Sequence, residues 1–311
     1  MAREPKLGMP FEPRFLLFFA CADAAVLLFA VVGCRLTSIE VPDLAGHVIG
    51  LCAVIALVQW LPLYWHDRGK PDLRDAALTV PLGLVFAICL PYALAVAARL
   101  GAGNELQDLR LSGLDQSLGV RVPGIMSWAT HHWIGSLASK SYGLLTPFLL
   151  ISFLLPGLTG KVYPAQRFLT ANLIAFAIGT PIFALLPAVG PWYAFHFEPT
   201  STQAFCQKEL LLLRMHGPYL FHPAGIVCFP SFHVIWAILC PCALWHYRVL
   251  RIPMAIFAGL IVLSTLTTGW HYFADVLAGL VVATIAAIAA DALVGSTSSR
   301  WKPESVETPQ A

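Results

Sequence analysis

Long apolar runs separated by short polar segments form the dominant pattern along this 311-residue chain. Each run is apolar on all sides rather than along one stripe, which is typical of helices that face lipid. A helix that crosses a bilayer needs about 20 mostly apolar residues. Eight runs come close to that length, at residues 15–34, 45–65, 76–98, 141–158, 168–188, 226–246, 253–270 and 272–294. The pattern therefore predicts an all-α, polytopic transmembrane helical bundle.

Two longer segments, 99–140 and 189–225, are predicted to lie outside the membrane on the same side. The first mixes leucines with charged residues, which predicts an amphipathic helix on the membrane surface. The residues that form this mixture are Leu106, Leu109, Leu111, Leu114, Asp108, Arg110 and Asp115. The second begins with Gly190-Pro191-Trp192-Tyr193, and aromatic residues of this kind favour the membrane–water interface.

Composition narrows the class of protein further. Hydrophobic residues make up 58% of the chain and charged residues 12%, whereas about 25% of a soluble domain is charged. An ordinary soluble enzyme and a disordered protein are therefore excluded. The net charge of +2 provides no basic surface for DNA or RNA. The eight cysteines show no zinc-finger spacing, although Cys206 and Cys228 flank one outer segment and could pair in an oxidising compartment.

Positive residues predict the orientation, because Lys and Arg gather in cytoplasmic loops. With both termini in the cytoplasm, 12 of the 19 Lys and Arg residues fall on the inner side. We divide the chain into N-terminal spans at 1–100, a membrane-embedded core at 101–295 and a disordered cytoplasmic tail at 296–311. The Ala- and Leu-rich composition suggests a bacterial inner membrane, with the outer segments in the periplasm.

The first candidate for chemistry is Pro230-Ser231-Phe232-His233, at the outer entrance of the sixth run. Ser is a favoured N-cap, and the free N–H groups of a helix N-terminus bind anions. His233 then falls in the first helical turn, beside any anion held there. The alternative is that Ser231 only caps the helix and that His233 lies in the wet interface.

The second candidate is the segment from Gly269 to Asp275, at the entrance of the eighth run. His271 and Asp275 stand at positions i and i+4, so they share one helical face. A carboxylate beside an imidazole fixes its tautomer and prepares it as a base or nucleophile. The alternative is a pair that packs the bundle. Because the sixth run leads inward and the seventh returns, His233 and His271 are predicted to reach the same membrane face.

These residues resemble the motifs of the type 2 phosphatidic acid phosphatase superfamily of membrane lipid phosphatases, over roughly residues 140–294. The family pattern has Lys, six residues and Arg-Pro; then Pro-Ser-Gly-His; then Ser-Arg, five residues, His, three residues and Asp. Here the residues from Pro230 to His233 match the second part. Ser264, His271 and Asp275 match the third part at the family's spacing.

The sequence departs from that pattern at three points. Phe232 replaces a glycine, and Thr265 replaces an arginine that helps to bind phosphate in the family. The Lys and Arg-Pro string is absent. Its nearest substitutes are the pair Lys161 and Arg167, predicted to face the cytoplasm, and the pair Lys208 and Arg214, in the same outer segment as His233. We prefer the second pair, because it lies on the same side as His233. These departures are similar to those of one branch, the inositol phosphorylceramide synthases and sphingomyelin synthases.

The resemblance implies phosphoryl transfer that uses no metal and no cofactor. His271 would attack the phosphorus of a lipid phosphate ester, Asp275 would hold the other ring nitrogen, and His233 would protonate the departing oxygen. A phosphohistidine intermediate would then pass to water or to an alcohol acceptor. The residues expected to bind the phosphate are Ser231, Arg214 and Lys208. The implied partners are a membrane lipid phosphate and, for transfer, an alcohol.

Two other classes of protein remain open at the level of sequence. A transporter is expected to show an inverted repeat or matching pairs of broken spans, and neither is visible. A non-catalytic membrane protein with a degenerate site would account for Thr265 and for the missing Lys and Arg-Pro string. The position of the polar residues distinguishes these classes, because an enzyme gathers them at one membrane face and a transporter near the midplane.

Overall fold

The computed structural model describes residues 13–42, 71–215 and 217–299, together with the single positions 46, 50, 53, 56, 60, 64 and 69. The described chain is mostly helical, and its strands are the two-residue β1 (Ile39–Glu40) and β2 (Tyr219–Leu220), which pair in parallel. The prediction of an all-α polytopic bundle is confirmed. Most of the expected span at 45–65, and residues 300–311 of the expected tail at 296–311, lie outside the described residues, whereas residues 296–299 are helical.

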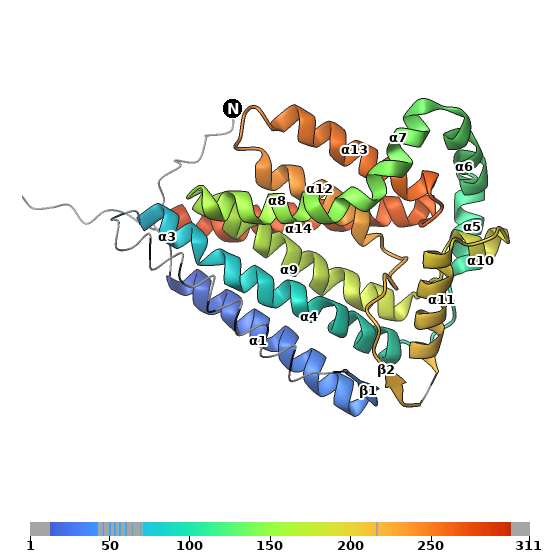
Figure 1. Cartoon of the computed structure of the whole chain (residues 1–311), viewed down its shortest axis with the longest axis horizontal. Helices are drawn as coiled ribbons and strands as arrows, with labels where there is room; N and C mark the ends of the chain where they lie inside the picture. Colours follow the sequence, from blue (N-terminus) through green and yellow to red (C-terminus); the bar gives the residue numbers. More distant parts are fainter. Residues whose placement is uncertain are drawn as a thin grey trace, which may run out of the picture.

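The long helices of the bundle run side by side (Figure 1). They are α1 (Pro13–Leu36), α4 (Thr79–Leu100), α8 (Leu145–Leu158), α9 (Val162–Leu185), α12 (Phe232–Leu244), α13 (Arg251–Thr267) and α14 (Phe273–Ser299), with the short α3 (Pro71–Ala77) before α4. Helix α9 packs against α4, α8, α12 and α14, so it connects the N-terminal helices to those that carry the candidate motifs.

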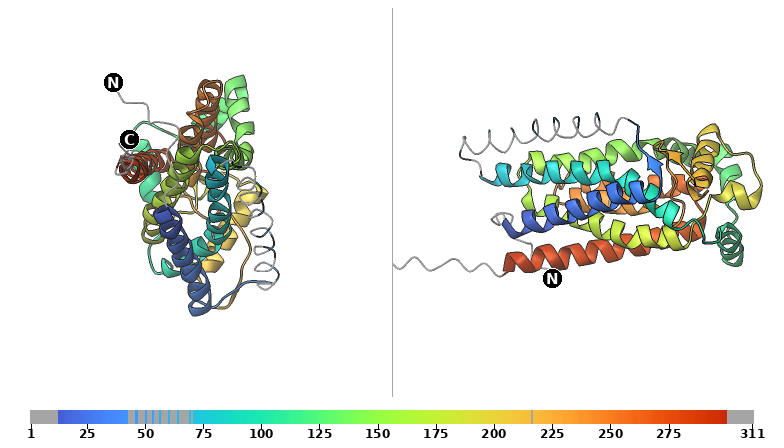
Figure 2. Two further views of the ribbon diagram at one scale, coloured as in Figure 1. Left: turned by 90° about the vertical axis from the view of Figure 1, so that its left-hand side faces the viewer. Right: turned by 90° about the horizontal axis from the view of Figure 1, so that it is seen from below.

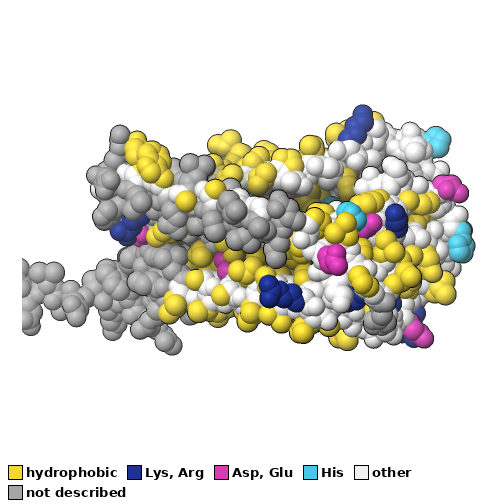
Figure 3. Space-filling model, turned by 60° about the horizontal axis from the view of Figure 1, so that its bottom comes forward, with side chains coloured by type: hydrophobic (Ala, Val, Ile, Leu, Met, Phe, Trp, Pro, Cys, Tyr) yellow, Lys and Arg dark blue, Asp and Glu magenta, His cyan; other side chains and the backbone are white. Residues whose placement is uncertain are grey.

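In the part of the chain that the structure describes, five helical segments are long and apolar enough to cross a membrane. They are Leu17–Leu36, Leu73–Leu100, Trp133–Leu158, Val162–Leu185 and Phe273–Gly295. The apolar helices α12 and α13 are shorter. Hydrophobic side chains cover much of the visible flank of the molecule (Figure 3). These long apolar helices identify an integral membrane protein.

Several predicted runs differ from the helices in their boundaries, and the run at 168–188 begins late, because α9 already starts at Val162. The run at 226–246 begins too early, because α12 starts only at Phe232. Pro230 has no backbone N–H and disfavours a helical residue before it, and the Ser231 hydroxyl caps the helix by accepting the Val234 N–H at 3.3 Å. The run at 141–158 begins too late, because the helical segment there extends from Trp133 through the short 3₁₀ turn η1 (Tyr142–Leu144) into α8.

Short helices cover one end of the bundle, as Figures 1 and 2 show. They are α5 (Asp108–Ser117), α6 (Val122–His131), α7 (Trp133–Ser141), α10 (Pro191–Phe195) and α11 (Ser201–Arg214). All of them come from the two segments predicted to lie outside the membrane. The N-terminus of α12 and the turn between α13 and α14 reach this same end.

The predicted surface helix around residues 106–115 is wrong in its orientation. Helix α5 forms there, but its acidic residues face the protein interior: Asp108 and Asp115 are 1% and 0% exposed, whereas Leu109 is 74% exposed. Both carboxylates accept backbone N–H groups from neighbouring segments. Buried N–H groups require such acceptors, and an apolar side chain cannot provide one.

The turn between α13 and α14 determines the position of His271. Gly269 adopts φ +70°, a left-handed conformation that is common just after a helix ends. The N–H groups of Trp270 and His271 both donate to the Thr265 carbonyl at 3.1 Å. The Thr265 hydroxyl donates to the Val262 carbonyl at 2.7 Å. Thr265 therefore holds this turn through its backbone.

Replacing Gly269 by alanine is expected to lower the free energy of unfolding by about 1–3 kcal/mol. The left-handed φ disfavours a Cβ atom, and that atom would lie 2.6 Å from Met126 Sδ. Thermal unfolding in detergent measures the loss. Gly259→Ala is the matched control, because Gly259 lies in α13 with nothing within 4 Å of an added Cβ, so alanine there is expected to be neutral or stabilising. Equal losses in the two variants would contradict the role of Gly269.

Candidate active site

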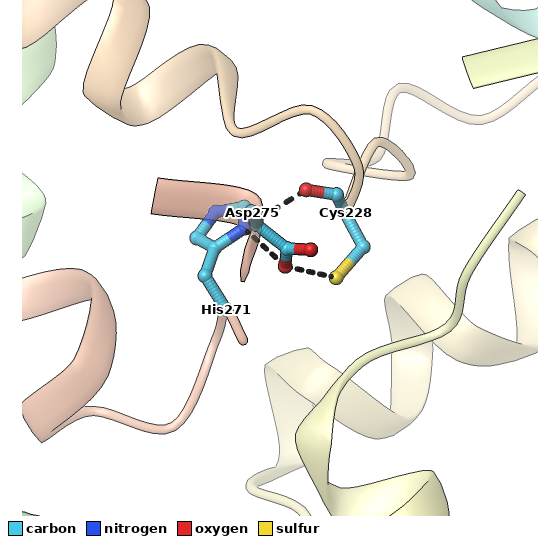
Figure 4. Close-up of side chains that lie close together, drawn as sticks. All are labelled: Cys228, His271 and Asp275. Carbon is cyan, nitrogen blue, oxygen red and sulfur yellow. Dashed lines mark hydrogen bonds and ion pairs between the residues drawn. The ribbon is translucent and has the colours of Figure 1, made fainter. Parts of the chain in front are cut away.

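His271 and Asp275 form a buried pair at the covered end of the bundle (Figure 4). The Nδ1 atom of His271 lies 3.3 Å from Asp275 Oδ2 and 3.0 Å from the Cys228 carbonyl oxygen. Asp275 Oδ2 also accepts the Tyr272 N–H at 2.8 Å and the Cys228 thiol at 3.0 Å. Three donors thus converge on one carboxylate oxygen, which is the arrangement that stabilises an ionised carboxylate.

The protonation state of His271 follows from these neighbours. Both groups beside Nδ1 are acceptors, so Nδ1 carries the ring proton and Nε2 keeps its lone pair. Burial lowers the pKa of His271 to about 4, and the hydrogen bond to the Cys228 carbonyl opposes that shift. The imidazole is therefore neutral at pH 7. A neutral ring with an unprotonated Nε2 is the form that nucleophilic catalysis requires.

His233 lies beside this pair, as the order of the helices predicted. The ring centroids of His233 and His271 are 5.7 Å apart, and Tyr142 stacks on His233 at 4.4 Å. The Ser231 N–H donates to the Asp275 carbonyl at 3.3 Å, which ties the start of α12 to the start of α14. Two motifs that are distant in sequence therefore meet at one point.

The two histidines line a pocket of about 350 Å³. Its wall is mostly apolar and aromatic, and no Lys or Arg is among the described residues that line it. The polar or aromatic lining residues are Tyr142, Thr202, Cys206, Cys228, Phe232, His233, Trp236, Trp270 and His271. Trp270 continues the aromatic wall, because its ring stacks on Tyr142 at 5.7 Å. The pocket can accept a ligand with an apolar part and a reactive group near the histidines.

Asp108 supports the site from α5. Its carboxylate accepts the Val189 N–H at 3.0 Å, the Gly190 N–H at 2.9 Å and the Tyr272 hydroxyl at 2.9 Å. Burial raises the pKa of Asp108, and the hydrogen bonds from these three groups act in the opposite direction. Tyr272 follows His271 directly, so Asp108 fixes the segment that carries the candidate nucleophile.

Asp115 holds the residues that follow Tyr272 in place in the same way. Its two carboxylate oxygens accept the N–H groups of Phe273 and Ala274, each at 2.8 Å. Those N–H groups belong to the first turn of α14 and have no partner within the helix. The spacing of seven residues that separates Asp108 from Asp115 places both on one helical face. A helix on the membrane surface would turn this acidic face toward water, whereas both carboxylates are buried here.

Asp115→Asn is expected to lower the free energy of unfolding by about 1–3 kcal/mol. Asparagine has one acceptor oxygen, so its amide nitrogen would face the N–H group of Phe273 or Ala274 and leave it unpaired. Thermal unfolding in detergent measures the loss. Glu105→Gln is the control: the Glu105 side chain is 85% exposed, and its substitution is expected to stay within about 0.5 kcal/mol of wild type. A loss of similar size in the two variants would contradict the role of Asp115.

The structure does not bring the two predicted basic residues to the pocket. The Arg214 guanidinium donates to the carbonyl oxygens of Gly101 and Asn104, at the C-terminal end of α4. Lys208 lines a separate surface hollow with Met215. Helix α11 lines the pocket with Thr202 and Cys206 instead. Ser231 is buried at the site, where its hydroxyl acts as the cap of α12.

Cys228 contributes to the site in a way that sequence reasoning missed. Its thiol donates a hydrogen bond to Asp275, and its carbonyl oxygen accepts one from His271 Nδ1. Cys206 and Cys228 are both free thiols in the structure, and both line the pocket. Cys228, His271 and Asp275 also form a group whose nearest ligand atoms all lie within 4.8 Å of one another, a spacing that could hold a metal ion. The signal in the sequence was weak, because Cys228 stands 43 residues from His271.

The fold and the site together define an integral-membrane helical bundle with a buried His–Asp pair and a facing histidine at one end. The chain belongs to the PAP2 superfamily, whose family model matches residues 109–289. The match begins in α5 and ends in α14, so it includes both histidines and Asp275. Members of this superfamily are phosphatases and phosphotransferases. No curated protein and no solved structure matches the chain.

Proposed function

We propose that this protein is a lipid phosphatase or phosphotransferase that acts through a phosphohistidine on His271. The observation that carries the proposal is the arrangement around His271. Its Nδ1 is bonded to Asp275 and to the Cys228 carbonyl, which leaves Nε2 unprotonated beside a pocket that His233 also lines. That arrangement prepares one imidazole to attack and a second to assist the leaving group.

The reaction takes place in two displacements. His271 Nε2 attacks the phosphorus, the P–O bond to the lipid breaks, and the leaving oxygen takes a proton from His233. Water or an alcohol then attacks the phosphorus, gives its proton back to His233, and breaks the N–P bond. Asp275 stabilises the positive charge that the His271 ring carries while phosphorylated.

The N-terminus of α12 is the proposed donor for the phosphate oxygens. Ser231 caps this helix, and the N–H groups of Phe232 and His233 occupy its first turn, where backbone donors and the helix dipole favour an anion. Arg214 and Lys208 are not retained as phosphate ligands, because neither lines the pocket. Thr265 stands where the family has an arginine, so the turn between α13 and α14 contributes no cation.

The lining of the pocket favours a phosphodiester as the lipid substrate. A phosphomonoester is close to a dianion at neutral pH, whereas a phosphodiester carries one negative charge. The described lining residues include no Lys or Arg to balance a second charge. This property supports the transferase branch that the motifs resemble, in which a head group passes from one lipid to an alcohol. Hydrolysis of a monoester is the second candidate reaction.

A panel of lipids tests the proposal. Detergent-purified protein is incubated with phosphatidic acid or with phosphodiester lipids, each with and without ceramide or diacylglycerol as the alcohol. A new head-group lipid without free phosphate is the expected result, and inorganic phosphate from phosphatidic acid would establish hydrolysis instead. If no lipid in the panel is converted and no phosphorylated protein can be trapped, the protein is not a catalyst of this class. The transporter alternative is disfavoured, since His233, His271 and Asp275 meet at the first turns of α12 and α14, at the end of the bundle that the short helices cover, and not midway along the helices.

We also propose that both termini are cytoplasmic and that the site faces the outer side, which is the periplasm if the membrane is a bacterial inner membrane. The distribution of Lys and Arg supports this orientation. A cysteine introduced at exposed Ser117 is expected to react, in intact cells, with a maleimide that cannot cross membranes. A cysteine at exposed Arg248, at the other end of the bundle, is expected to react only after lysis. Labelling of the wild-type cysteines, measured in parallel, is subtracted in both cases. Inverted labelling would reverse the proposed orientation.

A further inference from the structure

We propose that Cys228, His271 and Asp275 form a binding site for a zinc-like divalent cation that switches the catalytic imidazole off (Figure 4). Binding of the metal is independent of the proposed function, and only its inhibitory effect rests on it. A thiolate, an imidazole and a carboxylate are the ligand types that zinc prefers, and the thiolate selects against magnesium and calcium.

The spacing of the three side chains is close to what a tetrahedral cation needs. Cys228 Sγ lies 3.0 Å from Asp275 Oδ2, which lies 3.3 Å from His271 Nδ1. With ordinary zinc bond lengths, the ligand atoms of a tetrahedral site are roughly 3.4–3.6 Å apart. These two separations therefore need to widen by only a few tenths of an ångström, and all three ligand atoms already lie within 4.8 Å of one another. Three protein ligands leave a fourth position for water.

The charge of the cluster points to a cation as well. Asp275 is fully buried, and among the residues that the structure describes its one ion-pair partner is His271, whose ring is neutral. Asp275 Oδ1 has no hydrogen-bond partner among the described residues, although it is buried. A buried carboxylate oxygen without a partner is costly. A bound divalent cation would coordinate Oδ1 or Oδ2 of Asp275 and compensate the negative charge of this carboxylate.

The proton balance explains why the cation would inhibit. Before binding, the cluster holds a thiol, a His271 ring protonated at Nδ1 and a carboxylate, with a total charge of −1. On binding, the thiol proton leaves to solvent and the ring proton moves from Nδ1 to Nε2, because a metal on Nδ1 needs that lone pair. The total charge becomes zero. Nε2 then has no lone pair for attack on phosphorus.

The cluster borders the pocket that we assign to the lipid phosphate, because Cys228 and His271 both line it. The metal and the lipid phosphate then compete for the same space. We therefore expect zinc to act as an inhibitor whose effect is reversed by a chelator.

Cobalt is the probe for this site, because a thiolate bound to Co²⁺ gives a near-ultraviolet charge-transfer band. The full-length protein in detergent is expected to bind one Co²⁺ per chain with this band, and Zn²⁺ should displace it. The band is expected to be lost in Cys228→Ala and in Cys228→Ser. The serine variant keeps a hydroxyl donor toward Asp275, so it separates loss of the ligand from loss of the fold. Competition with zinc should show at least about tenfold weaker binding in both variants.

Cys206→Ser is the matched control, because Cys206 lines the same pocket but does not belong to the cluster. Its cobalt band is expected to match that of wild type. A band that survives in Cys228→Ser would place the metal elsewhere and overturn the proposal, as would the absence of any thiolate band in wild type. The cobalt spectrum can be recorded without any turnover of lipid. If the protein binds the metal but converts no lipid, the proposed function is refuted and the metal site is not.

Discussion

Replacing His271 by asparagine is expected to lower the rate of lipid conversion by at least about 10⁴-fold. Asparagine can present an N–H group close to the position of Nδ1, so the hydrogen bonds to Asp275 and to the Cys228 carbonyl can be kept. It offers no counterpart of the Nε2 lone pair, which is the group that attacks phosphorus. The loss therefore reports the chemistry at Nε2 rather than the integrity of the site.

Two measurements check this prediction. Steady-state turnover of the best lipid from the panel gives the rate, and a short incubation with lipid labelled at phosphorus, followed by a denaturing quench, traps an acid-labile phosphoprotein. Wild type is expected to show the labelled band and His271→Asn to lack it. His132→Asn is the control, because His132 is an exposed residue of the covering helices whose ring bonds the Trp128 carbonyl. Labelled protein in His271→Asn would assign the nucleophile to another residue.

Asp275→Asn is expected to reduce kcat by about 10³–10⁴-fold with a smaller change in KM. The carboxylate holds the His271 ring with the proton on Nδ1 and stabilises the positive charge that develops on the ring. An amide in the same place can turn its nitrogen toward Nδ1, which favours the tautomer with the proton on Nε2. The substrate still binds, but the attacking nitrogen is no longer available.

Asp291→Asn provides the comparison for that variant. Asp291 also lies on α14 and pairs with Arg167. Neither Asp291 nor Arg167 lines the pocket, so loss of this pair affects stability and not the reacting atoms. A phosphorylated intermediate that still forms in Asp275→Asn, but slowly, would fit the expected role. If Asp275→Asn retained more than about a tenth of the activity while His271→Asn retained none, the Cys228 carbonyl alone would be enough to orient the ring.

The sequence was sufficient for the features that depend on local chemistry. Apolar runs predict helices because the bilayer demands internal hydrogen bonding, and every run inside the described residues coincides with one. The meeting of His233 and His271 followed from the alternating direction of successive spans. The pairing of His271 with Asp275 followed from helical spacing, even though His271 itself lies just before α14 and belongs to its entry turn.

The features that depend on tertiary contacts could not be predicted in this way. A leucine-rich helix with two acids looks like a surface helix until the backbone N–H groups at Val189 and Phe273 are placed beside it. The side chain of Arg214 finds carbonyl oxygens at the end of α4, which no spacing rule reveals. The contribution of Cys228 arises because a loop without regular structure passes over α14. In each case the partner is distant in sequence.

The position of Asp108 and Asp115 also has a consequence for biosynthesis. Chains are made from the N-terminus, and domains form as their parts emerge. Both acids are translated long before the N–H groups of Phe273 and Ala274 exist, so these two partners of Asp115 are missing until the start of α14 has been made. A chain interrupted before α14 exposes an unpaired carboxylate where the finished protein buries one.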